Sequence, residues 1–276
     1  MNNKFKEYMT ECDELYFSND IPCVYKINQN TTVDLYPIKV KDWGIFEKSF
    51  DLISYKKNEI PDVEIIQMSY LEFLYQVIII GNAFGNGKYV SMALGNFINY
   101  VLHEEECSVR CVNNIWEIVI LDGNAIKYSI NSKEFEQLMK AVMYQNIFEY
   151  DDREISADVR DLYNTYVKAT NANYRHPSLE EQKTYVMANS GYSMKEINEM
   201  SYRVFSQIFN HDVNIVNYIS DKIIQASSKY QIDEDIIHPC YAKKKDKYAV
   251  LFTDASTLAK KGIDGASQLA NLNNIE

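Results

Sequence analysis

The chain has 276 residues, of which 46% are hydrophobic and 24% charged, and its formal net charge at pH 7 is −11. These proportions are typical of globular proteins and exclude a largely disordered chain. The excess of acidic side chains repels a phosphate backbone, so nucleic acid is not expected as a partner. No apolar run is long enough to cross a bilayer, and charged residues follow Met1 where a secretory leader would have its apolar core. We therefore expect the protein to stay in the cytoplasm in which it is made, away from membranes.

The cysteines indicate free thiols. Their number is odd and none forms a CxxC pair, so neither a disulfide framework nor a zinc ribbon is predicted. They stand at Cys12, Cys23, Cys107, Cys111 and Cys240. On a helix, His103, Cys107 and Cys111 would share one face, but residues 108–112 alternate as a strand does. We therefore predict no metal site and no cofactor.

The N-terminal part is predicted to combine helices with a small β-hairpin. Lys4–Phe17 carries apolar residues on one side and acids on the other, as an amphipathic helix does. Val24–Ile27 and Thr32–Val40 flank a polar turn and predict two antiparallel strands. Asp42 can cap a helix that continues to about Ser54, because apolar residues recur there every three or four positions.

The middle of the chain is predicted to hold two buried helices and a β-meander. Glu64–Ile80 is apolar around most of its circumference, which indicates a central buried helix, and Tyr89–Leu102 is similar. From Cys107 to Ile130 the apolar period changes to two, with turn signals at residues 113–114 and 122–124. This pattern predicts three antiparallel strands.

Helices dominate the second half. Asn131 and Glu134 resemble a capping box, which would start a helix that runs to about Tyr144. Further helices are predicted at residues 155–169, 178–189, 193–209 and 213–228, the second and third with capping boxes of their own. A short strand at residues 248–252 and a helix at 254–260 are predicted in the tail.

The predicted fold class is therefore α+β, mainly helical, with an N-terminal β-hairpin and a small antiparallel three-stranded meander. We expect an N-terminal α+β domain at residues 1–150, into which the meander is inserted at about residues 107–130. A helical domain at residues 151–240 and a partly flexible C-terminal extension at residues 241–276 would follow.

A glycine-rich loop offers the strongest hint of chemistry. Gly81–Lys88 follows an apolar run and ends in Gly-Lys, as loops that cradle phosphates do. A P-loop needs glycine five residues before that pair and Ser or Thr after it, but here these positions hold Asn82 and Tyr89. An apolar strand that ends in Asp122 has the outline of a Walker B strand, yet its next residues form a strong hairpin turn. A nucleotide-binding enzyme that uses Lys88 and Asp122 stays an alternative.

No catalytic residue is predicted elsewhere. The sequence has no nucleophile elbow, and its paired acids stand at helix starts or in polar loops, where acids complement the helix dipole or remain solvated. The histidines are isolated from one another, at His103, His176, His211 and His238. We therefore expect a binding protein and not an enzyme.

Several segments resemble uncharacterised proteins of tailed phages and prophages of low-GC Gram-positive bacteria. The resemblance covers about half of the chain and rests on Ile130–Phe135, Tyr144–Asn146, Pro177–Gln182, Ser190–Ser193 and Met200–Phe205. The hairpin that carries Leu35–Asp42, followed by aromatic-rich helices, is similar to phage tail-assembly chaperones and baseplate-assembly proteins. The chain continues beyond Ile236–Pro239, where such proteins end.

This resemblance implies a non-enzymatic tail morphogenesis protein. It would act in the host cytoplasm as an assembly chaperone that binds the tape-measure protein or another tail subunit, and it could form a homo-oligomer. The expected partner-binding residues are Trp43, Phe46, Tyr70 and Phe73, although core packing is the competing interpretation for each. A structural component of the baseplate or neck, retained in the virion, is the alternative.

Overall fold

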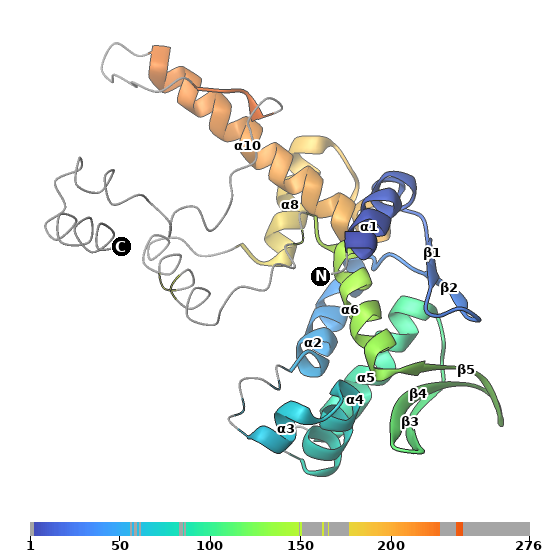
Figure 1. Cartoon of the computed structure of the whole chain (residues 1–276). Coiled ribbons are helices and arrows are strands. Elements are labelled where there is room, and N and C mark those ends of the chain that lie inside the picture. Colours follow the sequence, from blue (N-terminus) through green and yellow to red (C-terminus); the bar gives the residue numbers. More distant parts are fainter. Residues whose placement is uncertain are drawn as a thin grey trace, which may run out of the picture. The chain divides into compact units, whose positions relative to one another are not determined.

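Figure 1 shows the computed structural model. Its internal contacts divide the chain into two units. Unit 1 comprises Met1–Asp151 and Glu180–Val213, and unit 2 comprises Asp152–Leu179 and Asn214–Glu276. The structure describes residues 3–55, 57, 60, 62–82, 85, 87–148, 150, 162, 165, 177–226 and 236–239.

The predicted fold class, α+β and mainly helical with two small antiparallel sheets, is confirmed. Within the described ranges, no helix combines the length and the apolar character needed to cross a membrane.

The predicted hairpin is confirmed and follows helix α1 (Asn3–Leu15) and a short 3-10 helix, η1 (Phe17–Asn19). Strands β1 (Cys23–Lys26) and β2 (Thr32–Leu35) pair antiparallel. Strand β2 ends at Leu35 and does not reach Val40 as predicted. The chain leaves the sheet there because the following backbone amides donate to acceptors outside the sheet. The amide of Tyr36 donates to the carbonyl of Val101 over 2.9 Å.

Helix α2 (Val40–Ile53) begins before the predicted cap at Asp42. Its N-cap residue is Lys39, whose side chain caps nothing, and Asp42 lies in the first turn. There the carboxylate faces the positive end of the helix dipole. The prediction therefore misplaced the cap but located an acid where the helix dipole favours one.

The single helix predicted over residues 64–80 is wrong, because the chain breaks at Ser69. Helix α3 (Val63–Gln67) ends before it, and α4 (Tyr70–Glu72) and the π-helical η3 (Phe73–Ile80) follow. The hydroxyl of Ser69 accepts the amide of Glu72, and the Glu72 carboxylate accepts the amide of Ser69. This capping box starts a new helix, a signal that the strong apolar pattern of the segment obscured.

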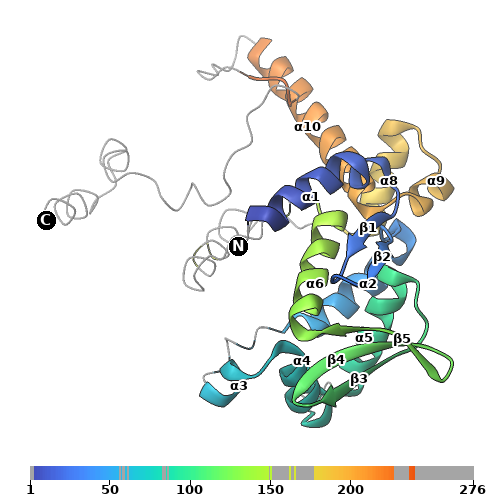
Figure 2. The same ribbon diagram turned by 45° about the vertical axis from the view of Figure 1, so that its right-hand side comes forward.

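The predicted meander is confirmed and follows helix α5 (Gly87–Leu102). Its strands are β3 (Cys107–Val112), β4 (Ile115–Asp122) and β5 (Ala125–Asn131), in that spatial order. Figure 2 shows the sheet beside α4 and α5, with α6 (Ser132–Asn146) starting directly after β5. The predicted capping box at the start of α6 is also confirmed, because the side chain of its N-cap residue accepts the amide of Glu134 over 3.1 Å.

The helices of the second half are α8 (Leu179–Ser190), α9 (Met194–Glu199) and α10 (Tyr202–Ala226). The predicted break at residues 211–212 is wrong, since α10 continues through them. Histidine and aspartate cost only tenths of a kcal/mol in a helix. The break lies at Ser201 instead, whose hydroxyl accepts the amide of Val204 over 3.3 Å. The helix predicted at residues 155–169 and the elements predicted after residue 240 lie outside the described ranges.

The core of unit 1 contains a cluster of aromatic rings among its aliphatic side chains. Phe97 of α5 packs against Phe46 of α2 and Phe135 of α6, with ring centroids 6.1 and 5.8 Å apart. Tyr70 of α4 approaches the ring of Phe135 from the other side, at 6.4 Å. Large flat side chains bury much area at little cost in rotamer entropy, so this cluster fixes how α2, α4, α5 and α6 lie against one another.

Candidate functional site

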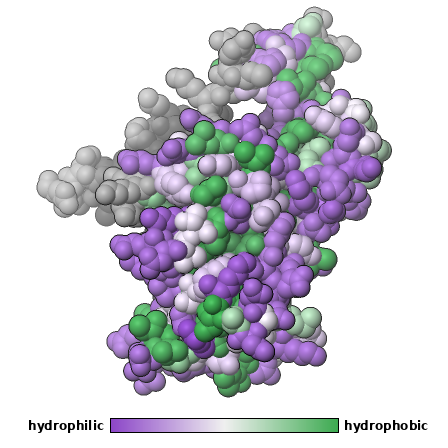
Figure 3. All heavy atoms as spheres, turned by 90° about the vertical axis from the view of Figure 1, so that its right-hand side faces the viewer, coloured by the Kyte–Doolittle hydropathy of each residue, from purple (hydrophilic) through white to green (hydrophobic). Residues whose placement is uncertain are grey.

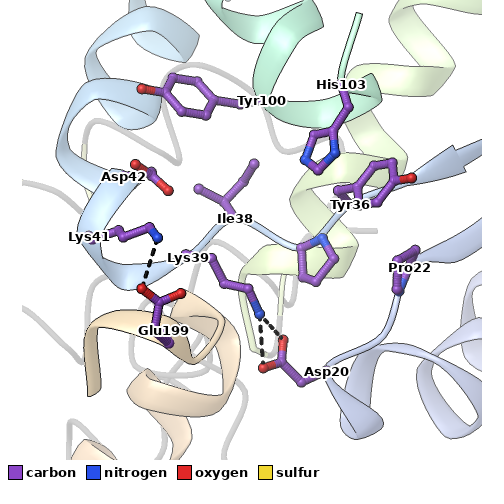
Figure 4. A pocket seen from close by; sticks show the side chains of 11 residues that line it. Asp20, Pro22, Tyr36, Ile38, Lys39, Lys41, Asp42, Tyr100, His103 and Glu199 are labelled. Carbon is purple, nitrogen blue, oxygen red and sulfur yellow. Dashed lines mark hydrogen bonds and ion pairs between the residues drawn. The ribbon is translucent and has the colours of Figure 1, made fainter. Parts of the chain in front are cut away.

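Two hollows lie among the described residues of unit 1, and the first is a polar cleft of about 340 Å³ (Figure 4). It lies where the segment between β2 and α2 passes the end of α5 and the end of α9. The name polar cleft refers to this hollow throughout, and its side chains include Asp20, Tyr36, Lys39, Lys41, Asp42, Tyr100, His103 and Glu199.

A stacked ring pair forms one wall of the polar cleft. The rings of Tyr36 and His103 lie 3.6 Å apart and are inclined by 13°. His103 follows α5 with a left-handed backbone, φ +53°, and its amide donates to the carbonyl of Asn99 over 2.9 Å, as at many helix C-termini. Because the Tyr36 amide is bonded to the end of the same helix, the backbone holds both rings in place.

Ion pairs match both lysines of the polar cleft with acids, and Asp42 adds a further carboxylate to its lining. Lys39 lies 3.3 Å from Asp20, and Lys41 lies 2.9 Å from Glu199. The hydrogen bond to Glu199 raises the pKa of Lys41, and the same bond lowers the pKa of Glu199. Among the described residues, the lining contains no serine, threonine or cysteine.

The second hollow is an aromatic groove of about 290 Å³ beside α6. Its walls come from the end of α2, from α4 and from α6. The name aromatic groove refers to this hollow, which is lined by Phe50, Ser54, Tyr55, Tyr70, Glu136, Met139, Lys140, Met143 and Tyr150. Six of these nine side chains are aromatic or thioether groups, which offer apolar and polarizable surface to a ligand.

Two polar groups are fixed in the aromatic groove. The hydroxyl of Tyr70 donates to the carbonyl of Ile53 at the end of α2, and burial raises the pKa of this hydroxyl. Glu136 reaches solvent at the rim, yet the apolar walls around its carboxylate raise its pKa. Burial thus disfavours the charged form of Glu136 in the groove.

Of the four residues predicted to bind a partner, one lines a hollow. Tyr70 is 8% exposed and contributes to the aromatic groove. Trp43, Phe46 and Phe73 are 5%, 1% and 0% exposed and line neither hollow. Trp43 stacks on Tyr202 with ring centroids 3.6 Å apart. The structure thus gives these three rings packing positions, which is the competing interpretation that the sequence left open.

The glycine-rich loop has internal contacts that explain its residues. The side-chain oxygen of Asn82 accepts the amide of Gly87 over 2.8 Å, at the start of α5. A Cβ atom at Gly87 would overlap the carbonyl oxygen of Ile79, so close packing requires glycine here. Lys88 is exposed, and Asp122 is the last residue of β4, opposite Ala125 in the hairpin. Within the described residues, no hydrogen bond or ion pair joins Lys88 to Asp122.

Sequence reasoning missed the pairing of two cysteines. Cys12 of α1 and Cys23 of β1 are both buried, with their sulfur atoms 3.3 Å apart. The apolar side of the predicted helix contained Cys12, whereas Cys23 precedes the strand predicted from Val24, and nothing in the sequence placed the two cysteines against each other. Among the residues that the structure describes, no cluster of three or more His, Cys, Asp or Glu side chains could hold a metal ion.

Comparison with known proteins assigns no family to this chain: no family model matches it, and no curated protein or solved structure shows significant similarity.

Proposed function

We propose that this protein is a non-enzymatic tail morphogenesis protein of a tailed phage or prophage. It binds an apolar helical segment of another tail subunit, such as the tape-measure protein, before assembly. The observation that carries the proposal is the aromatic groove, in which aromatic and methionine side chains surround one hollow on unit 1. The resemblance of residues 130–135 and 144–146 to uncharacterised phage proteins supports the phage assignment, and these residues include both ends of α6, which forms one wall.

The size of the aromatic groove favours side chains over a cofactor. Small-molecule sites usually measure about 300–1,000 Å³, so a hollow of about 290 Å³ is at the low end. It suits one or two large apolar side chains that a helix projects at positions three or four apart. Methionines such as Met139 and Met143 adapt their shape to different partners, as expected for a chaperone.

One face of the molecule offers mainly polar surface to a partner. The face shown in Figure 3 is mostly hydrophilic, with hydrophobic residues in separate small groups. A recessed groove with polar surroundings is therefore a better anchoring point than that face. The net charge of −11 disfavours acidic partners and favours a helix whose flanking residues are basic.

Co-expression with a tail protein of the same phage genome tests the binding surface. Met143 is half-buried in the groove, and Met92 of α5 is 57% exposed and lies outside it, so the two provide a matched pair. We expect the wild-type chain and Met92→Glu to keep the tape-measure protein soluble and to purify with it. Met143→Glu should lose the complex while keeping its circular dichroism spectrum. Equal behaviour of the two variants would reject the groove as the site.

Mass spectrometry of purified particles and of infected-cell lysate tests the chaperone role. A chaperone should be abundant in the lysate and absent from particles. Stoichiometric presence in particles would contradict this role and favour the alternative, a baseplate or neck subunit.

A further inference from the structure

Two buried thiols of unit 1 lie in direct contact. Cys12 on α1 and Cys23 at the start of β1 are 1% and 0% exposed. The S–H group of Cys23 donates to the sulfur of Cys12 across 3.3 Å. By contrast, Cys107 and Cys111 lie on one strand, where Cys107 is half-buried and Cys111 is exposed. Only the first pair is therefore arranged for a reaction between its members, among the cysteines that the structure describes.

The local structure keeps the two thiols facing each other. Met9 and Cys12 share the buried side of α1, where residues three apart are neighbours. Strand β1 alternates buried and exposed positions from Cys23, so its first side chain points inward. The hydroxyl of Tyr8 donates to the carbonyl of Val24 over 2.6 Å and ties the helix to the strand beside the pair.

Hydrogen bonding makes the two thiols chemically different. The hydrogen bond from Cys23 lowers the pKa of the Cys12 thiol, against the opposing effect of burial. Donating that bond, together with burial, raises the pKa of Cys23. Because the thiolate is the reactive form, Cys12 is the nucleophile of the pair and Cys23 the group that reacts second.

We propose that Cys12 and Cys23 form a redox-active dithiol, which hydrogen peroxide converts into an intramolecular disulfide. The Cys12 thiolate attacks one peroxide oxygen, the O–O bond breaks, and the departing hydroxide takes up a proton to become water. The product is a sulfenic acid at Cys12. The sulfur of Cys23 then attacks the sulfur of Cys12, the S–O bond breaks, and the second hydroxide leaves with the Cys23 proton. Two thiols lose two electrons in total, and one peroxide becomes two waters.

The distance to be closed is small. A disulfide bond measures about 2.05 Å, so the sulfur atoms must approach by about 1.3 Å from their separation of 3.3 Å. Peroxide is small enough to reach buried thiols during local opening of α1. The bond would tether α1 to β1 covalently and restrict that opening. This inference does not depend on the proposed function.

The test uses the full-length chain with Cys107→Ser, Cys111→Ser and Cys240→Ser, so that the pair alone carries thiols. After peroxide treatment, we expect a mass loss of about 2 Da that a dithiol reductant reverses. Peptide mapping should join Cys12 to Cys23, in this variant and in the wild-type chain. Adding Cys23→Ser should abolish the mass loss and leave a sulfenic acid that dimedone traps.

A result without the disulfide would overturn the proposal. The reference is the exposed Cys111 of the wild-type chain, whose oxidation sets the peroxide dose. If the pair keeps both thiols at that dose, or oxidises only to sulfinic acid, the two cysteines are packing residues. Hydrogen exchange adds a second readout, since oxidation should slow exchange of the α1 amides several-fold. Unchanged exchange would contradict the tether.

Discussion

The guanidinium of Arg203 lies 2.6 Å from the carboxylate of Asp13, although 190 residues separate them in the chain. The same guanidinium donates to the carbonyl of Tyr144 over 2.9 Å and to that of Ile147 over 3.3 Å. It is almost fully buried, at 4% exposed. Arg203 therefore joins the start of α10 to α1 and to the end of α6, and these contacts hold the segment after α9 within unit 1.

Replacing Arg203 with methionine should destabilise unit 1 by about 2–3 kcal/mol, because two part-buried carbonyls and the Asp13 carboxylate lose their donor while the apolar stem is retained. Urea unfolding followed by circular dichroism measures the loss. The matched control is Lys41→Met, which removes the exposed pair with Glu199 and should change stability little. Equal stability of the Arg203 variant and the wild type would contradict a joining role.

Alanine substitutions at two glycines of α5 should change the stability of the protein in opposite directions. At Gly87 an added Cβ overlaps the backbone of Ile79, so Gly87→Ala should cost about 1–3 kcal/mol. At Gly95 an added Cβ would have no neighbouring atom within 4 Å, so Gly95→Ala should stabilise the folded protein by about 0.5–1 kcal/mol. Thermal unfolding of the two variants checks both signs. A neutral Gly87→Ala would show that the loop can shift and that packing does not require glycine.

The sequence predicted the elements of unit 1 well where one local signal dominated. The hairpin, the meander and the start of α6 were found because alternation and capping residues coincide there. The break at Ser69 was missed because apolar residues on both sides continue the helical pattern, and only the pair with Glu72 interrupts it. The interruption expected at residues 211–212 is absent because neither residue there removes a backbone donor.

The candidate site could be predicted only in part. Tyr70 was chosen for its aromatic ring and does line the aromatic groove, but Met139 and Met143 on α6 were not chosen. An apolar residue on a helix has the same sequence pattern whether it faces the core or a groove. The distinction depends on contacts between distant segments, such as the hydrogen bond of the Gln145 amide to the carbonyl of Leu35, 110 residues earlier, over 2.7 Å. Such contacts leave no local signal.

The pH dependence of stability should include a contribution from Glu136. Burial raises its pKa in the folded state, so between its ordinary pKa and the folded value the folded chain holds a proton that the unfolded chain has lost. Stability falls as pH rises through that window. Glu136→Gln should remove this fall, as measured by urea midpoints between about pH 4 and 7.

Glu117 supplies a control of opposite sign. Hydrogen bonds, first from Ser129 and then from Arg110, lower its pKa in the folded state. The stability that ionised Glu117 contributes is present above its ordinary pKa and is lost as pH falls through its lower pKa in the folded state. Glu117→Gln should therefore lower stability near neutral pH. If both variants shifted the midpoints alike, local pKa values would not explain the pH dependence.

Nucleotide binding should be absent if the glycine-rich loop has a packing role. Phosphate sites at helix N-termini use free backbone amides, whereas Asn82 already accepts the amide of Gly87. We expect no micromolar binding of ATP or GTP by calorimetry, with or without Mg²⁺, and no change in stability on adding nucleotide. Lys88 is exposed, so Lys88→Ala should leave stability unchanged and report only on a ligand. Micromolar affinity that is lost in Lys88→Ala would overturn the non-enzymatic proposal and establish this loop as the functional site.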